Sequence, residues 1–189
     1  FFGTSQAVYP FLYGETSISN IVKRYPASYL FKPLLYLSSL LMIAYWLNYR
    51  RIFSKIEKTN NAKKIEFFLI FGILSSFCLF LHVLFLGTDI DSSIFKKFRR
   101  LNIALFIFFE LTAQFFLAKR IFTLKEMLLD YTYKVFVYLK ITFVTTILLI
   151  TAISITILII SNPDQTFNNI LEWNYFCFLL IFYLLSAMM

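Results

Sequence analysis

The chain of 189 residues is 60% hydrophobic and 21% aromatic, and its net charge is +8. A soluble domain averages about 45–50% apolar residues, so one small core cannot enclose this apolar surplus, and the composition indicates a membrane protein. The 18 Lys and Arg residues lie between apolar runs. Basic residues in such positions set topology and attract anionic lipid headgroups, so they do not predict a nucleic-acid partner.

No metal or cofactor site is predicted. The chain has a single His and lacks the HExxH, CxxC, P-loop and GxGxxG patterns. Its two cysteines, Cys78 and Cys177, lie inside apolar runs, where they do not form a disulfide framework. The motifs that most often identify a metalloenzyme, a nucleotide-binding protein or a redox protein are therefore missing from the sequence.

Apolar runs of about 17–25 residues, the length that crosses a hydrocarbon core, predict five transmembrane helices. They cover about 34–49, 65–86, 101–118, 135–160 and 173–189. Residues 1–33 are predicted as a polar non-cytoplasmic loop, with Pro33 at the first helical turn, and residues 161–172 as a turn. The predicted fold is an all-α integral membrane bundle over 34–189. Because the chain does not begin with Met, we expect it to be a fragment, preceded either by a removed signal or by a first helix.

The charges of the loops predict the orientation. Five spans place loops 50–64 and 119–140 on one side, and this side carries eleven cations, Lys140 included, against seven on the other. By the positive-inside rule the eleven-cation side is cytoplasmic. Tyr45, Trp46 and Tyr49 close the first span, where aromatic residues are typical of the membrane interface.

Glu110 stands in the middle of the third span, with Gln114 one helical turn later and the small Ala113 beside it. A central charged residue opposes insertion by about 2.5 to 3.5 kcal/mol, which the surrounding Leu, Ile and Phe residues offset. The face that carries Glu110 and Gln114 is therefore predicted to point at other helices. Two roles stay open for Glu110: binding of a proton or substrate, or a hydrogen bond that fixes helix packing.

His82 lies in the preceding antiparallel span, at a depth that brings it near Glu110. A His–carboxylate pair is suited to proton transfer or acyl chemistry, but no Ser or Cys nucleophile motif accompanies it. The alternative is a His that hydrogen-bonds a neighbouring helix. The Ser and Thr residues of the fourth span are predicted to bond their own backbone or to bridge helices.

Two stretches of the chain resemble the DRAM/Frag/Sfk family of multi-pass membrane proteins. Residues 16–51 resemble the family's first loop and second helix, and residues 172–186 resemble the Glu-Trp start of its last helix. The matching residues are Ser17, Ile18, Ser19, Pro26, Ser28, Phe31, Tyr49, Arg50, Glu172 and Trp173. The resemblance implies a six-helix plan and a role in lipid organisation or autophagy modulation, in an endomembrane or the plasma membrane, with no family catalytic residue to assign.

The predicted function is therefore that of a non-catalytic membrane protein acting through helix–helix and lipid contacts. Its predicted partners are membrane lipids, with anionic headgroups at the basic loops, and other membrane subunits. One alternative is an accessory subunit of a large complex, such as a respiratory-chain assembly of the mitochondrial inner membrane. The other is a lipid-remodelling enzyme that uses His82 and Glu110.

Overall fold

The computed structural model describes residues 9–18, 25–57, 66–85, 93–161 and 164–189. Every regular element in these ranges is a helix, and five helices are long and apolar enough to cross a membrane, which confirms the predicted all-α class. The five are α3 (Ala27–Ile56), α4 (Phe67–Leu84), α5 (Ser93–Thr123), α7 (Lys134–Ser161) and α8 (Gln165–Ala187). Of two short helices, α1 (Pro10–Tyr13) precedes α3 and α6 (Lys125–Leu128) lies between α5 and α7.

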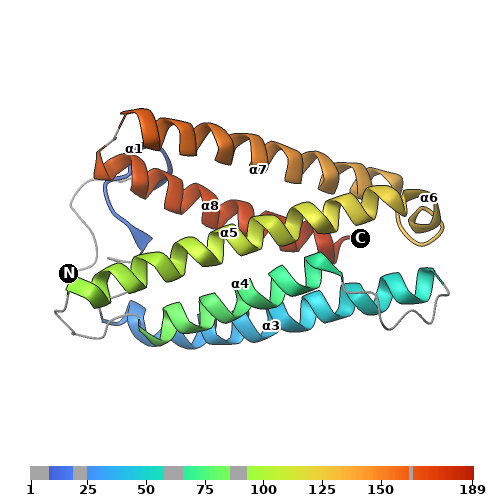
Figure 1. Ribbon diagram of the computed structural model, residues 1–189, viewed down its shortest axis with the longest axis horizontal. Coiled ribbons are helices and arrows are strands. Elements are labelled where there is room, and N and C mark those ends of the chain that lie inside the picture. The colour runs from blue at the N-terminus through green and yellow to red at the C-terminus, as the bar shows by residue number, and fades with distance from the viewer. Residues whose placement is uncertain (1–8, 19–24, 58–65, 86–92, 162–163) are drawn as a thin grey trace.

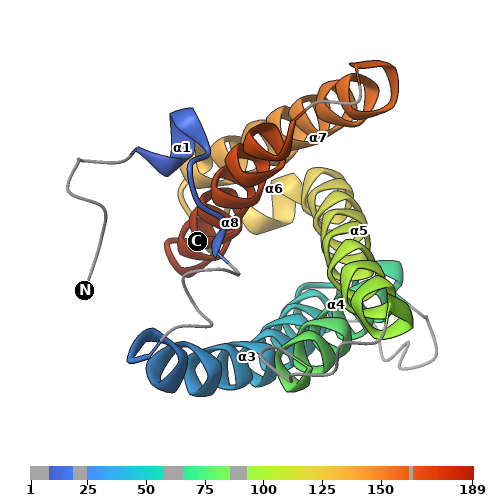
Figure 2. The same cartoon turned by 90° about the vertical axis from the view of Figure 1, so that its left-hand side faces the viewer.

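The five long helices run side by side and alternate in direction (Figure 1). Seen along the bundle, they follow one another round a ring in the order α3, α4, α5, α7 and α8 (Figure 2). Consecutive helices are antiparallel neighbours because the connections between them are short. The end of α3, the start of α4, α6 and the start of α7 therefore lie at the same end of the bundle, where the two most basic loops were predicted to meet.

The first long helix begins earlier than the sequence predicted. α3 starts at Ala27, directly after Pro26, so residues 27–33 belong to the bundle and not to the polar loop. Pro33 lies inside the helix and not in its first turn, with its ring on an exposed face. At 30 residues α3 is about 45 Å long, so it extends beyond a hydrocarbon core of about 30 Å.

The last helix also begins earlier than predicted. Residues 165–172, predicted as part of a turn, form the first two turns of α8. Polar residues in these two turns bind the N-terminal segment. Asn169 Nδ2 donates to the Gly14 carbonyl at 2.7 Å. Trp173 Nε1 donates to the Thr16 carbonyl at 2.9 Å. Gly14 has φ of +59°, a conformation that glycine adopts without a steric penalty.

Large aromatic side chains fill the middle of the ring. Trp46, Phe53, Phe68 and Phe182 are at most 2% exposed. Trp46 was predicted at the membrane interface, but its indole lies against Gly72 of α4, and a Cβ at that glycine would collide with the ring. The end of α3 is thus an interior packing surface, because its aromatic residues face the other helices of the ring.

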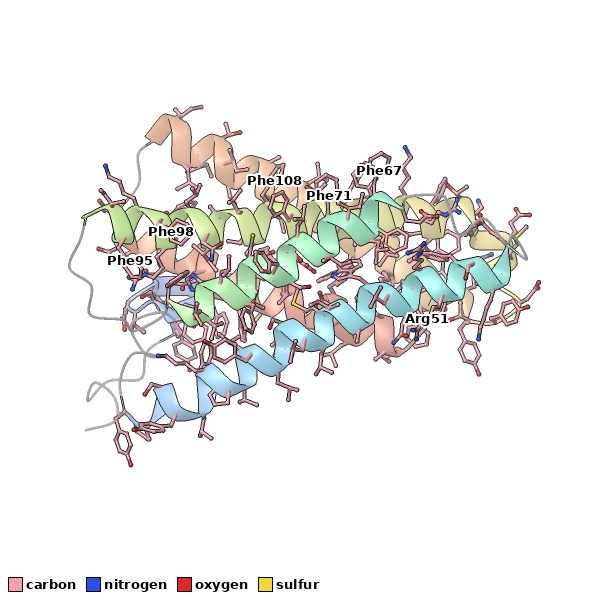
Figure 3. The ribbon with its side chains drawn as sticks, turned by 60° about the horizontal axis from the view of Figure 1, so that its bottom comes forward. Arg51, Phe67, Phe71, Phe95, Phe98 and Phe108 are labelled. Atoms are coloured by element: carbon pink, nitrogen blue, oxygen red, sulfur yellow. The ribbon has the colours of Figure 1, made fainter. Side chains whose placement is uncertain are left out.

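The outer surface of α4 and α5 carries a second set of aromatic residues, which Figure 3 shows along the outside of these helices. Phe71 stacks on Phe116 with ring centroids 5.9 Å apart and planes 4° apart, and Phe67 stacks on the same ring at 5.3 Å. Phe67 and Phe108 are 59% and 60% exposed. An apolar outer face of this kind is what lipid tails require of a spanning helix.

Candidate functional site: two buried polar clusters

Glu110 of α5 is 0% exposed, and both of its carboxyl oxygens have partners. Ser75 Oγ of α4 donates to Oε2 at 2.6 Å. Gln114 Nε2 donates to Oε1 at 3.1 Å, and Tyr183 OH of α8 donates to the same oxygen at 2.9 Å. These four residues, the Glu110 cluster, hold three helices together. The prediction that Glu110, Gln114 and Ala113 face the other helices is confirmed, since all three are at most 2% exposed.

Lys140 of α7 is also 0% exposed. Its Nζ donates to Tyr49 OH at 2.8 Å, to Tyr45 OH at 3.1 Å and to Ser186 Oγ. An ammonium group has three N–H donors, so these three hydroxyl oxygens of α3 and α8 accept all of them. We call Tyr45, Tyr49, Lys140 and Ser186 the Lys140 cluster.

Aromatic rings enclose the same ammonium group. Its Nζ lies 4.6 Å from the ring centroids of both Tyr49 and Phe182, within the range of a cation–π interaction. Hydroxyl oxygens and ring faces thus replace the water that a cation would have at the surface. The described residues place no carboxylate in ion-pair contact with Lys140, and its hydrogen-bond partners are all neutral hydroxyl groups.

The two clusters meet in the middle of the ring. Tyr45, from the Lys140 cluster, and Tyr183, from the Glu110 cluster, contact each other edge to face with centroids 4.7 Å apart. Tyr45 OH also lies 2.8 Å from Ser186 Oγ, which joins α3 to α8 and closes the ring. Each of the five long helices therefore supplies at least one polar side chain to the interior.

Sequence reasoning missed the Lys140 cluster. Lys140 was counted as a loop cation that sets topology, but α7 begins at Lys134 and carries Lys140 into the bundle in its second turn. The signal was present, because five consecutive apolar or aromatic residues, 135–139, separate this lysine from Lys134. Tyr49, predicted as an interface residue, is 8% exposed and bonds the same lysine.

The structure does not join His82 to Glu110. His82 lies two helical turns along α4 from Ser75, a rise of about 10 Å. Its ring bonds the backbone of Arg99, and its Nδ1 has no partner in the part of the chain that the structure describes. This geometry matches the alternative interpretation, a His that bonds a neighbouring helix, and gives the enzyme hypothesis no His–carboxylate pair.

Threonine hydroxyl groups along α7 donate hydrogen bonds to the backbone of the same helix. Thr146 Oγ1 donates to the Thr142 carbonyl at 2.9 Å, and Thr151 Oγ1 donates to the Ile147 carbonyl at 2.8 Å. Thr145 and Thr156 make bonds of the same kind. The prediction of hydrogen bonds to their own backbone is therefore confirmed for these four threonines.

Three of the residues that carry the family resemblance line one apolar groove of ≈ 300 Å³ at the start of α3 and α8. They are Ile18, Phe31 and Trp173. Leu34 of α3 and Phe176 of α8 extend the groove toward the middle of the bundle. Two stretches more than 120 residues apart in sequence thus form one surface.

The other resemblance residues are dispersed. Pro26 precedes α3 and Ser28 lies in its first turn, while Arg50 is exposed beside the buried Tyr49. Ser17 is 6% exposed and Glu172 is half-buried on α8. Ser19 lies outside the described residues. No single contact surface gathers these side chains, in contrast to the groove.

At the opposite end of the bundle, Arg120 links three helices. Its Nη2 lies 2.6 Å from Glu57 Oε1, just after α3, and 3.3 Å from Glu66 Oε1, just before α4. Exposed cations surround this end, and exposed aromatic residues accompany them. The exposed set comprises Arg50, Arg51, Lys55, Lys119, Lys134, Phe122, Tyr131 and Tyr133.

Comparisons of the chain with family models, with characterised proteins and with solved structures find no match. The resemblance of the two stretches to the DRAM/Frag/Sfk family therefore stays a prediction. Function must be inferred from the chain's own residues: an apolar exterior, two buried polar clusters, an apolar groove at one end and a basic, aromatic surface at the other.

Proposed function

We propose that this protein is a non-catalytic, multi-pass membrane protein that acts through contacts of its helices with lipids and with other membrane helices. The observation that carries the proposal is the exterior of α7 and α8. In the most apolar 18-residue stretch of each helix, only 11% of the residues of α7 and 6% of those of α8 are buried. Such faces are soluble only in lipid or against other apolar helices.

The interior supports the same proposal. The carboxyl oxygens of Glu110 and the ammonium of Lys140 bond side chains of neighbouring helices. Polar groups arranged in this way fix the register and choice of neighbours in a helix bundle. With His82 two turns away, Glu110 and His82 do not form the His–carboxylate pair on which the enzyme alternative depends.

Lipids are the first class of partner. The apolar groove between α3 and α8 suits an acyl chain, and the basic, aromatic end suits anionic headgroups, which attract Lys and Arg by about 1 kcal/mol each. The family resemblance points the same way, because it implies lipid organisation in an endomembrane or the plasma membrane. A fluorescent fusion expressed at native level would show which membrane the protein occupies.

Purification from native membrane in a gentle detergent tests the proposal. We expect the protein to migrate at its own mass with co-purifying lipids, detected by native mass spectrometry. Migration within a large, stable complex would instead identify an accessory subunit whose exposed α7 and α8 faces contact partner helices. A substrate-dependent change of lipid composition by the purified protein would overturn the non-catalytic assignment.

The lipid contacts are tested by charge removal. In nanodiscs, replacing Arg51, Lys55, Lys119 and Lys134 with Gln should lower the number of anionic lipids retained after delipidation. Lys97→Gln, an exposed cation at the other end, is the matched control and should retain them. Equal retention by both variants would contradict a lipid site at the basic end.

A further inference from the structure

Ser75 Oγ lies between two hydrogen-bond acceptors. It is 2.6 Å from Glu110 Oε2 and 3.0 Å from the backbone carbonyl of Gly72, one turn earlier in α4. A hydroxyl group carries a single proton and accepts through its lone pairs. Ser75 therefore gives a full hydrogen bond to only one of the two oxygens at a time.

Each direction of the Ser75 bond corresponds to one proton state of Glu110. When Ser75 donates to Oε2, Glu110 is a carboxylate that receives three donors, the other two being Gln114 and Tyr183. When Ser75 donates to the Gly72 carbonyl, a proton on Oε2 is donated to Ser75 Oγ, while Oε1 still accepts from Gln114 and Tyr183. Both states satisfy the cluster with the same heavy-atom positions, because only protons move.

Opposing electrostatic effects act on this carboxyl. Full burial disfavours any charge on Glu110, whereas the three donors Ser75, Gln114 and Tyr183 favour the carboxylate. The titratable groups that face Glu110 from the packed helices are Tyr45 of α3 and Tyr175 and Tyr183 of α8. Its hydrogen-bond partner from α4 is the neutral Ser75.

We propose that Glu110 is a reversible proton-binding site inside the bundle and that Ser75 is the hydroxyl that adjusts to its two proton states. The ligand is a single proton, taken up from or released to solvent. Its uptake changes the charge of the interior by one unit, because the ionised Glu110 carries one negative charge and the protonated Glu110 carries none. An intramembrane carboxyl with these properties is typical of proton-linked membrane proteins.

The infrared C=O stretching band of a protonated carboxyl tests this site. In purified wild-type protein in nanodiscs we expect a band that disappears as the pH is raised and that Glu110→Gln removes. Ser75→Ala should move the pH midpoint of the band upward by about one unit, because the bond lost by the carboxylate is charge-assisted and stronger than the neutral one. Labelling of glutamate with ¹³C in the wild-type protein identifies the band without any substitution.

Ser76→Ala is the matched control. Ser76 is the next residue, is also 0% exposed, and also donates to the Gly72 carbonyl, at 2.8 Å, but it does not contact Glu110. The pH midpoint of the carboxyl band in Ser76→Ala should equal that of the wild type. The proposal is overturned if the band does not change with pH over the range in which circular dichroism shows the native helix content. It is overturned equally if Ser76→Ala moves the midpoint as far as Ser75→Ala.

Discussion

Tyr45 and Tyr183 join the two buried polar clusters of the bundle. Their rings meet at 4.7 Å, yet the hydroxyl of Tyr183 bonds Glu110 and the hydroxyl of Tyr45 bonds Lys140. One pair of aromatic side chains, on α8 and α3, thus connects the carboxyl group of Glu110 to the amine of Lys140. The described part of the chain shows no direct ion pair between them.

This relationship predicts an energetic coupling between Glu110 and Lys140. Glu110→Gln and Lys140→Met should each destabilise the bundle, and the double variant should lose less than the sum, with a coupling free energy of about 0.5–3 kcal/mol. The reason is that the two clusters share the Tyr45–Tyr183 contact, so a change in one cluster alters the packing of the other. SDS titration followed by circular dichroism measures the cycle. Strictly additive losses would show that the two clusters act independently.

The close contact between α3 and α4 predicts that Gly72→Ala destabilises the protein by about 1–3 kcal/mol, the usual effect of overpacking. A Cβ at this position meets the fully buried ring of Trp46. Thermal unfolding measures the loss, and Trp46→Phe in the same chain should restore part of it because the smaller ring leaves room. If the second substitution only adds to the loss, the ring is not the obstacle.

The Arg120 contacts predict a clamp between three helix ends. Arg120→Leu leaves Glu57 and Glu66 without their shared guanidinium and should lower the free energy of unfolding by about 1–2 kcal/mol. Lys119→Leu, at an exposed neighbouring position, is the control and should have a smaller effect. Unfolding at several salt concentrations separates the causes: a loss independent of ionic strength would argue for packing and against charge.

The N-terminal segment is predicted to be held by α8. Trp173→Phe keeps an aromatic ring beside Phe11, 5.3 Å away in the wild type, but removes the Nε1 donor to the Thr16 carbonyl. We expect limited proteolysis to cut within residues 9–18 several-fold faster in this variant, at unchanged helix content. Trp173→Leu, which removes the ring as well, should be cut faster still; cleavage at the wild-type rate in both would contradict the docking.

Much of this architecture was predictable from local sequence. Composition and the length of the apolar runs determined the helical class and the five long helices, because a segment's solubility in lipid depends on its own residues. The same holds for the face of α5: the spacing of Glu110 and Gln114 is enough to place both on one side of a helix. The hydrogen bonds from the α7 threonines to the backbone of their own helix depend on local sequence in the same way.

Sequence alone did not determine which polar residues lie inside. Lys140 and Tyr49 were assigned to a loop and to the membrane interface, and residues 165–172 to a turn. Each prediction was wrong because the residues that bond these side chains lie elsewhere in the chain. Hydroxyl groups of α3 and α8 make a buried ammonium tolerable, and the N-terminal segment gives the polar start of α8 its partners.

The sequence by itself determined that this chain forms long helices suited to lipid and that Glu110 faces other helices, since both depend on the period and polarity of one segment. Only the tertiary structure decided that Glu110 bonds Ser75 and Tyr183 and not His82, and that Lys140 is buried in a second polar cluster. The free energy of a buried polar group depends on the partners it meets, and those partners come from helices far apart in sequence.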